Sequence, residues 1–291
     1  MTRTTRLGLA LVLNLLLTAG LVVAGRAAHS TGLAADAGHN LTDAMAVLLV
    51  LVAEVLSLRP PTARRSFGLQ RASILAALAN AVVLVVVTGS IGWIAVARLV
   101  HPHPVHGGIV LVAASLSALV NLAVVSLLVD GHGDLSMRSA LLHAVGDVLG
   151  SAVVALSGLV ALVATGPVVE RLDPIASLLV AGLIVVEALR LTRSSLHILL
   201  EGVPVDVDLD EVRAAICAVP EVLEVHDLHV WSLSSTSRAL SAHLVVAGDP
   251  TLSVAADTVA STRSVLRSHF AIGHATLELE AAPCGGTAEH R

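Results

Sequence analysis

Six long apolar segments constrain the fold of this chain more than any other feature of its sequence. Runs of about 20 residues with almost no charge have the length that an α-helix needs to cross a bilayer. Of 291 residues, 55% are hydrophobic and only 13% are charged, against roughly 25% charged in an ordinary soluble domain. The composition therefore indicates a membrane protein. The predicted spans lie near residues 7–25, 35–57, 72–97, 107–129, 139–165 and 174–192.

The first apolar segment allows two interpretations. Its basic flank, its apolar core and the small residues that follow are typical of a secretory signal. However, the stretch from Leu7 to Gly25 is uncharged and nearly long enough to cross a bilayer. We therefore expect a retained first span, and a bundle of six transmembrane helices.

The distribution of arginine predicts how the bundle is oriented. With six spans, nine arginines of the transmembrane part fall on the side of the two termini. Only Arg26, Arg98 and Arg171 fall on the opposite side. The positive-inside rule then predicts a multi-pass protein of the cytoplasmic (inner) membrane with both termini in the cytoplasm.

The C-terminal part of the chain has the pattern of a soluble domain. Acidic residues after Pro204 are typical of a helix start, and that helix is expected to run to about Val219. VLEVHDLHVWSL and RALSAHLVVAG read as strands, PTLSVAADTVASTRSVLRSHF as a helix and HATLELE as a last strand. We expect residues 1–200 to form the six-helix transmembrane domain and residues 201–291 a cytoplasmic α-β-β-α-β domain.

Two of the predicted spans carry ionisable side chains at helical spacing. His39 and Asp43 are four residues apart in the second span, and His143 and Asp147 repeat this spacing in the fifth. Residues four apart lie on one face of a helix. Asp36 lies on the same stripe, either in an ion path or, as we favour, as a group that orients His39.

Metal binding explains these two pairs better than hydrogen bonding between helices does. An ionised Asp at the centre of a membrane helix costs at least ~2.5–3.5 kcal/mol. Two imidazoles and two carboxylates form a ligand set that suits tetrahedral Zn²⁺ and disfavours Cu(I), Mg²⁺ and Ca²⁺. Gly38, Gly146 and Gly150 flank the pairs, and we expect them to let the two helices approach closely.

The chemistry of these ligands favours a transporter over two other classes of protein. Imidazole and carboxylate must lose their protons to bind a metal, so protons and metal compete for the site, as proton-coupled export requires. An intramembrane metalloenzyme is disfavoured because no HExxH motif occurs and four protein ligands leave no open position. A membrane-bound zinc sensor without transport is the remaining alternative, although the soluble part has no recognisable DNA-binding motif.

The sequence resembles the cation diffusion facilitator family, in particular its bacterial zinc and cadmium efflux members. The matching segments are LAADAGHNLTDA, RPPTARRSFGLQR, LLHAVGDVLGS, LEGVP, HDLHVWSL and HATLELEAAPC. The resemblance implies a homodimeric Zn²⁺/H⁺ antiporter with a ferredoxin-like, metallochaperone-like cytoplasmic domain. It assigns the transport site to His39, Asp43, His143 and Asp147. His39 favours zinc, whereas Cd²⁺, Co²⁺, Fe²⁺ and Mn²⁺ stay open as substrates.

The same resemblance implies a second metal site in the cytoplasmic domain. His243 and Glu280 stand at ligand positions, with His226, His274 and Cys284 as companions. Zn²⁺ is thus expected both as transported substrate and as a ligand of this domain. The expected partners are divalent metal ions, protons, the lipid bilayer and a second copy of the chain. The net charge of -5 gives no indication of nucleic-acid binding.

Overall fold

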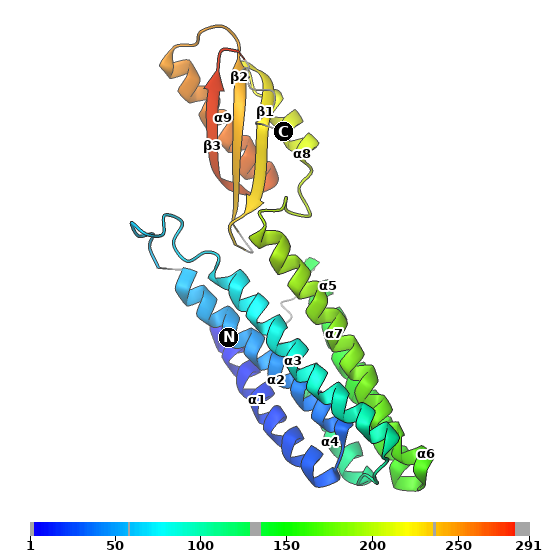
Figure 1. Ribbon diagram of the computed structural model, residues 1–291. Coiled ribbons are helices and arrows are strands. Elements are labelled where there is room, and N and C mark those ends of the chain that lie inside the picture. Colours follow the sequence, from blue (N-terminus) through cyan, green and yellow to red (C-terminus); the bar gives the residue numbers. More distant parts are fainter. Residues whose placement is uncertain (1–2, 58, 129–134, 235–236, 283–291) are drawn as a thin grey trace. The chain divides into compact units, whose positions relative to one another are not determined.

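Six long helices account for most of the first 200 residues (Figure 1). The structure is a computed structural model that describes the backbone of residues 3–57, 59–128, 135–234 and 237–282. Each of the six is long and apolar enough to cross a membrane, which confirms the predicted spans. They are α1 (Arg3–Ala28), α2 (Thr31–Ser57), α3 (Ala72–Val100), α4 (Gly107–Leu128), α5 (Leu135–Val163) and α7 (Leu172–Leu199), with the short α6 (Pro167–Glu170) before α7.

Several helices extend further than the apolar runs predicted. α5 begins at Leu135 rather than near residue 139, and α7 continues to Leu199 rather than ending near residue 192. A hydropathy pattern marks only the part of a helix in hydrocarbon, whereas the backbone hydrogen bonds continue into the polar boundary of the bilayer. In α7 the additional turns carry Arg193, a long side chain that can reach that boundary.

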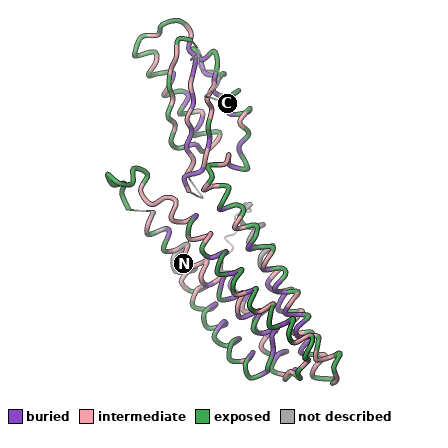
Figure 2. The backbone as a smooth tube through the Cα atoms, viewed as in Figure 1, coloured by how far each residue is buried: buried purple, intermediate pink, exposed green. Residues whose placement is uncertain are grey.

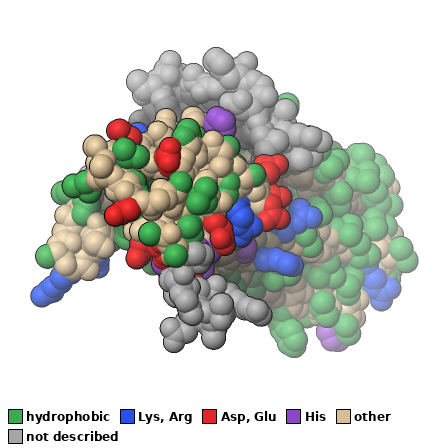
Figure 3. Space-filling view, turned by 90° about the horizontal axis from the view of Figure 1, so that it is seen from above, with side chains coloured by type: hydrophobic (Ala, Val, Ile, Leu, Met, Phe, Trp, Pro, Cys, Tyr) green, Lys and Arg blue, Asp and Glu red, His purple; other side chains and the backbone are tan. Residues whose placement is uncertain are grey.

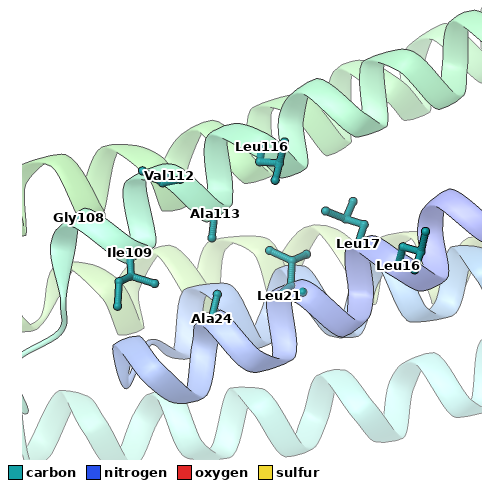
Figure 4. Close-up of a pocket in the computed structure, with 10 residues that line it drawn as sticks. Leu16, Leu17, Leu21, Ala24, Gly108, Ile109, Val112, Ala113 and Leu116 are labelled. Atoms are coloured by element: carbon teal, nitrogen blue, oxygen red, sulfur yellow. The ribbon is translucent and has the colours of Figure 1, made fainter.

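The helices bury one face and present large apolar side chains on the other (Figure 2). Leu16 of α1, Leu119 of α4 and Val163 of α5 are 66%, 64% and 77% exposed. In water such faces are costly, but against lipid tails they are neutral. A shallow groove between α1 and α4 has the same character, because its lining consists only of Leu, Ile, Val, Ala and Gly residues (Figure 4).

Glycine brings α4 and α5 into near backbone contact. A Cβ atom on Gly107 would lie 2.5 Å from the carbonyl oxygen of Gly158, and one on Gly158 would lie 2.7 Å from the amide nitrogen of Leu111. No larger residue fits at either position without moving a helix. Gly32 similarly lets α2 approach α5, where its Cβ would lie 3.1 Å from Val154 Cγ1.

The expected role of the three glycines beside the metal ligands is wrong. Gly38 faces α3, since its Cβ would lie 2.9 Å from Ile91 Cδ1. Gly150 faces α7, and Gly146 has nothing within 4 Å. For Gly38 and Gly146 the reason is geometric, because a residue next to a ligand in the sequence is turned by about 100° around the helix.

The C-terminal domain has the predicted order of helix, two strands, helix and strand. Its elements are α8 (Leu209–Cys217), β1 (Val222–Ser232), β2 (Arg238–Val246), α9 (Leu252–Phe270) and β3 (Ile272–Glu280). β2 is the central strand and pairs antiparallel with β1 and parallel with β3. Ile216, Leu240, Leu244 and Leu266 lie in its fully buried core.

The first helix of this domain begins later than predicted. Asp208 is the residue before α8, and its carboxylate accepts hydrogen bonds from the amides of Asp210 and Glu211. Asp206 instead binds Arg238 at 2.6 Å, which lowers the pKa of the Asp206 carboxyl. The visible surface of this domain carries acidic side chains, whereas the visible helical surface is mainly hydrophobic (Figure 3).

The chain divides into two compact units. One contains residues 1–55 and 76–192, and the other contains residues 56–75 and 193–291. The segment between α2 and α3 therefore groups with the C-terminal domain. Arg71 of this segment binds Glu201 at 2.8 Å, and the ring of Phe67 lies edge-on to His274 at a centroid distance of 5.3 Å.

Candidate metal centres

The start of α2, the helix that carries His39 and Asp43, is fixed by a carboxylate from α7. Asp173 is 1% exposed, and its Oδ2 accepts hydrogen bonds from the amides of Thr31 and Gly32 at 2.6 and 3.3 Å and from the Thr31 hydroxyl at 2.9 Å. Its Oδ1 accepts the Ser30 hydroxyl at 2.5 Å. The Ser30 oxygen in turn accepts the amide of Leu33, as an N-cap residue does.

The intramembrane cluster joins α2 to α5 through His39. The His39 Nε2 atom lies 2.6 Å from Asp147 Oδ1 and 3.7 Å from Asp43 Oδ2. One ligand atom from each of these three side chains lies within 4.8 Å of the others. His39 and Asp147 are buried and Asp43 is partly buried, so the structure brings three of the four predicted transport ligands together.

The fourth predicted ligand is only partly described. The backbone of His143 lies in α5, one helical turn before Asp147. Its side chain lies outside the residues whose side chains the structure describes. Residues four apart share a helix face, so His143 stays a prediction as the fourth ligand.

The hydrogen bonds of the Asp36 carboxylate in the structure join it to side chains other than His39, so its role in orienting His39 stays a prediction. Its carboxylate accepts hydrogen bonds from Asn40 at 3.2 Å and from Ser151 of α5 at 3.3 Å. The Ser151 hydroxyl also lies 3.3 Å from the hydroxyl of Ser117 on α4. Asp36 thus connects α2 to α5 one turn away from His39, and its hydrogen bonds lead to Asn40 and Ser151.

A second cluster lies on the sheet of the C-terminal domain, and each strand contributes one residue. His226 of β1 and His243 of β2 stand directly opposite each other in the antiparallel register. Glu280 of β3 lies 3.2 Å from His226 Nε2 through Oε2 and 2.7 Å from His243 Nδ1 through Oε1. All three are partly buried and lie within 4.8 Å of one another. Two imidazoles and a carboxylate fit the ligand preference of Zn²⁺.

Two further carboxylates near this cluster were missed in the sequence. Asp227 Oδ2 and Glu278 Oε2 lie 3.5 and 3.6 Å from His243 Nε2. Strict alternation along β1 would turn Asp227 to the face opposite His226. A register shift between His226 and His229, together with a φ of 48° at Asp227, changes that direction. Glu278, in contrast, was foreseeable because it lies two residues before Glu280.

One of the expected companions, His274, does not join this cluster in the part of the chain that the structure describes. His274 pairs with Ala239 at the other end of β3 and packs against Phe67. Glu280 lies six positions further along the strand, which corresponds to about 20 Å. His274 and Glu280 lie on the same face of β3, but they are too far apart to bind one metal ion. Cys284 lies outside the described residues.

Comparison with known proteins gives matches along nearly the whole chain. The family described as "Cation efflux transmembrane domain" matches residues 7–200, and "Cation efflux protein, cytoplasmic domain" matches residues 204–282. The zinc transporter ZitB of Escherichia coli is 39% identical over 268 residues, which cover 91% of this chain and 83% of the relative. Two other relatives give similar coverage.

The metal cation efflux system protein CzcD of Cupriavidus metallidurans is 35% identical over 264 residues, covering 90% of this chain and 82% of the relative. A Bacillus subtilis protein named as a cadmium, cobalt and zinc/H(+)-K(+) antiporter is 31% identical over 261 residues, covering 89% of this chain and 83% of the relative. All three names describe the transport of metal cations.

Proposed function

Because this chain belongs to the cation diffusion facilitator family of cation efflux transporters, we propose that it exports Zn²⁺ from the cytoplasm in exchange for protons. The observation that carries the proposal is the approach of His39 on α2 to Asp147 on α5, with 2.6 Å between Nε2 and Oδ1. Family membership confirms the resemblance seen in the sequence. It also confirms the prediction that the protein is a transporter and not an enzyme. The substrate, the coupling ion and the ligands are the proposed part.

Zinc is the substrate that this ligand set favours. His39, Asp43, Asp147 and the predicted His143 offer two nitrogen and two oxygen ligands, the number and type that Zn²⁺ takes in tetrahedral sites. Two of the three relatives have zinc in their names, and one of these two names also lists cadmium and cobalt. A His-Asp site accepts several divalent ions, so Cd²⁺ and Co²⁺ are expected as weaker substrates.

The geometry of the His39–Asp147 pair supports the proposed exchange with protons. Joint ligation of one Zn²⁺ at about 2.0–2.1 Å with a tetrahedral angle requires a separation of about 3.3 Å between the two ligand atoms. The observed separation is 2.6 Å, the length of a hydrogen bond that holds a proton on the line between them. Zn²⁺ and this proton therefore exclude each other, and loading the ion displaces it.

The membrane arrangement completes the proposal. The protein is a multi-pass membrane protein, and the arginine distribution supports the inner membrane with both termini in the cytoplasm. Residues 1–200 carry transport, and residues 201–291 form a cytoplasmic domain that dimerises the chain. In that domain His226, His243 and Glu280 would hold a resident Zn²⁺, which supplies a rigid link between three strands.

Flux measurements in proteoliposomes test transport and coupling together. Purified protein is reconstituted, a pH gradient is imposed, and Zn²⁺ flux is followed with an indicator dye. We expect gradient-dependent flux in the wild type and its loss in Asp43→Ala and Asp147→Ala. Ser157→Ala is the matched control, because Ser157 is buried on α5 but binds only the backbone of Val154. Flux that survives both Asp variants contradicts the site, and flux indifferent to the gradient contradicts the coupling.

A further inference from the structure

A second groove runs between α1, α2 and α3 and has a volume of about 590 Å³. On α2 it is lined by Thr31, Ala34, Ala37, Gly38 and Leu41. With 3.6 residues per turn, these positions lie on a different face of the helix from His39 and Asp43. The groove is therefore separate from the proposed transport site, although both involve α2.

One end of this groove carries two arginines. Arg26 in the last turn of α1 and Arg98 in the last turn of α3 both line it, together with the exposed His29. Only three arginines occur at this end of the bundle, and the third, Arg171, is not part of the lining. A cation at a helix C-terminus is favoured by the helix dipole. The dipole does not explain why two of them meet at one groove.

The lining of the groove contains no acidic side chain. Among the described residues, neither guanidinium forms an ion pair with a carboxylate; Arg98 donates one hydrogen bond to the carbonyl of His29. Guanidinium groups match the geometry of phosphate oxygens and bind them by charge-assisted hydrogen bonds.

The rest of the groove is apolar. Away from the arginines its walls are formed by Val22 of α1, Leu41 of α2 and Val87, Ile91 and Ile94 of α3. Val22, Leu41 and Ile94 are each more than a third exposed, so this wall faces the bilayer. A ligand that fits has an anionic head at one end and an aliphatic chain at the other.

The groove between α1 and α4 offers an internal comparison. It has a volume of about 480 Å³ and is lined by residues such as Leu17, Leu21 and Val112, without any charged residue (Figure 4). An acyl chain can lie there, but nothing selects its headgroup. From this contrast we infer that the α1–α2–α3 groove is a binding site for an anionic phospholipid, whose phosphate binds Arg26 and Arg98 and whose acyl chain lies along α3.

The inference does not depend on which ion is transported, so it can fail or hold independently of the proposed function. Each arginine near an anionic lipid headgroup should favour binding of that lipid over a zwitterionic lipid roughly fivefold. The two arginines together should then give a preference of about 25-fold. The preference is for net negative lipids such as phosphatidylglycerol over zwitterionic phosphatidylcholine, because the choline of the latter opposes the arginines.

Native mass spectrometry of the purified full-length protein tests this site. The protein is incubated with equal amounts of phosphatidylglycerol and phosphatidylcholine of the same acyl chains, and bound lipids are counted. We expect the preference for phosphatidylglycerol to fall about 25-fold in Arg26→Gln/Arg98→Gln and about fivefold in each single variant. Arg171→Gln, which removes a charge at the same end of the bundle, should leave it unchanged. Ala34→Leu should reduce the binding of both lipids without changing their ratio.

Three results would overturn the inference. An unchanged preference in the double variant would mean that the arginines do not select the headgroup. An equal loss in Arg171→Gln would reduce the effect to general surface charge. Displacement of phosphatidylglycerol by millimolar inorganic phosphate would identify a free anion as the ligand. If the double variant does not fold, the two single variants still test the expected fivefold effect.

Discussion

Replacing Asp173 should loosen the start of the helix that carries the proposed transport ligands. This carboxylate accepts hydrogen bonds from two amides and two hydroxyls at the start of α2. The hydroxyls can turn to other acceptors, but the amides of Thr31 and Gly32 cannot. Asp173→Ala therefore leaves two buried N–H groups without an acceptor and also removes a negative charge from a helix N-terminus.

The expected cost follows from these groups. Each buried amide left unpaired costs about 1–3 kcal/mol, and the Gly32 bond at 3.3 Å counts at the low end. The lost charge adds about 0.3–1 kcal/mol. We therefore expect Asp173→Ala to lower the free energy of unfolding by about 2–5 kcal/mol. Asp173→Asn should cost only about 1–2 kcal/mol, because its amide oxygen can keep the three bonds made by Oδ2.

Unfolding in mixed micelles, followed by circular dichroism, measures these differences. Glu170→Gln is the matched control, since it removes a carboxylate at the same end of the bundle and should change stability by less than about 0.5 kcal/mol. Asp173→Asn combined with Ser30→Ala should show a coupling of about 0.5–3 kcal/mol, because the two side chains are in contact. Equal stability of Asp173→Ala and Asp173→Asn, or strict additivity in the cycle, would refute the capping role.

Three further predictions follow from the packing and the charges. Gly158→Leu should prevent the contact of α4 and α5 and lower the yield of folded protein, whereas Gly146→Leu, at a position with nothing within 4 Å, should be tolerated; size-exclusion chromatography compares the two. Glu280→Gln and His243→Ala should each weaken Zn²⁺ binding to the cytoplasmic domain at least tenfold by equilibrium dialysis of the full chain, while His274→Ala should not. Because Arg238 lowers the pKa of Asp206, this pair stabilises the fold above the unfolded pKa of about 3.9 and the effect disappears as the pH falls through the lower folded value. Asp206→Asn should thus reduce stability at pH 7 by at most about 0.5 kcal/mol, since the carboxylate is exposed, and the difference from wild type should vanish in acid denaturation below that window.

Residue spacing in the sequence predicts those structural features that depend on a single helix or strand. The i, i+4 pair of His39 and Asp43 and the apolar length of each span follow from helix geometry alone. That β1 and β2 are neighbours also follows from their order in the chain, whereas the pairing of His226 with His243 depends on the strand register. These features depend on contacts close in sequence or on strand alternation.

Features that depend on tertiary packing could not be predicted from the sequence. Asp173 reads as an acidic residue that favours the start of its own helix, yet its carboxylate binds the start of α2, about 140 positions earlier in the chain. Asp227 reaches His243 through a bulge that strand alternation does not reveal. Gly38 and Gly150 face α3 and α7 rather than each other, because the neighbour that a helix face meets is set by the arrangement of the whole bundle.

The contact between Gly107 and Gly158 has a mechanical consequence for transport. Two helices whose backbones are in contact cannot rotate freely against each other, so we expect α4 and α5 to move as one rigid body. Any displacement of Asp147 during the cycle would then be transmitted to the lipid-facing side of α4. A spin label at Leu119, which is 64% exposed, would report that displacement from outside the ion pathway without touching a ligand.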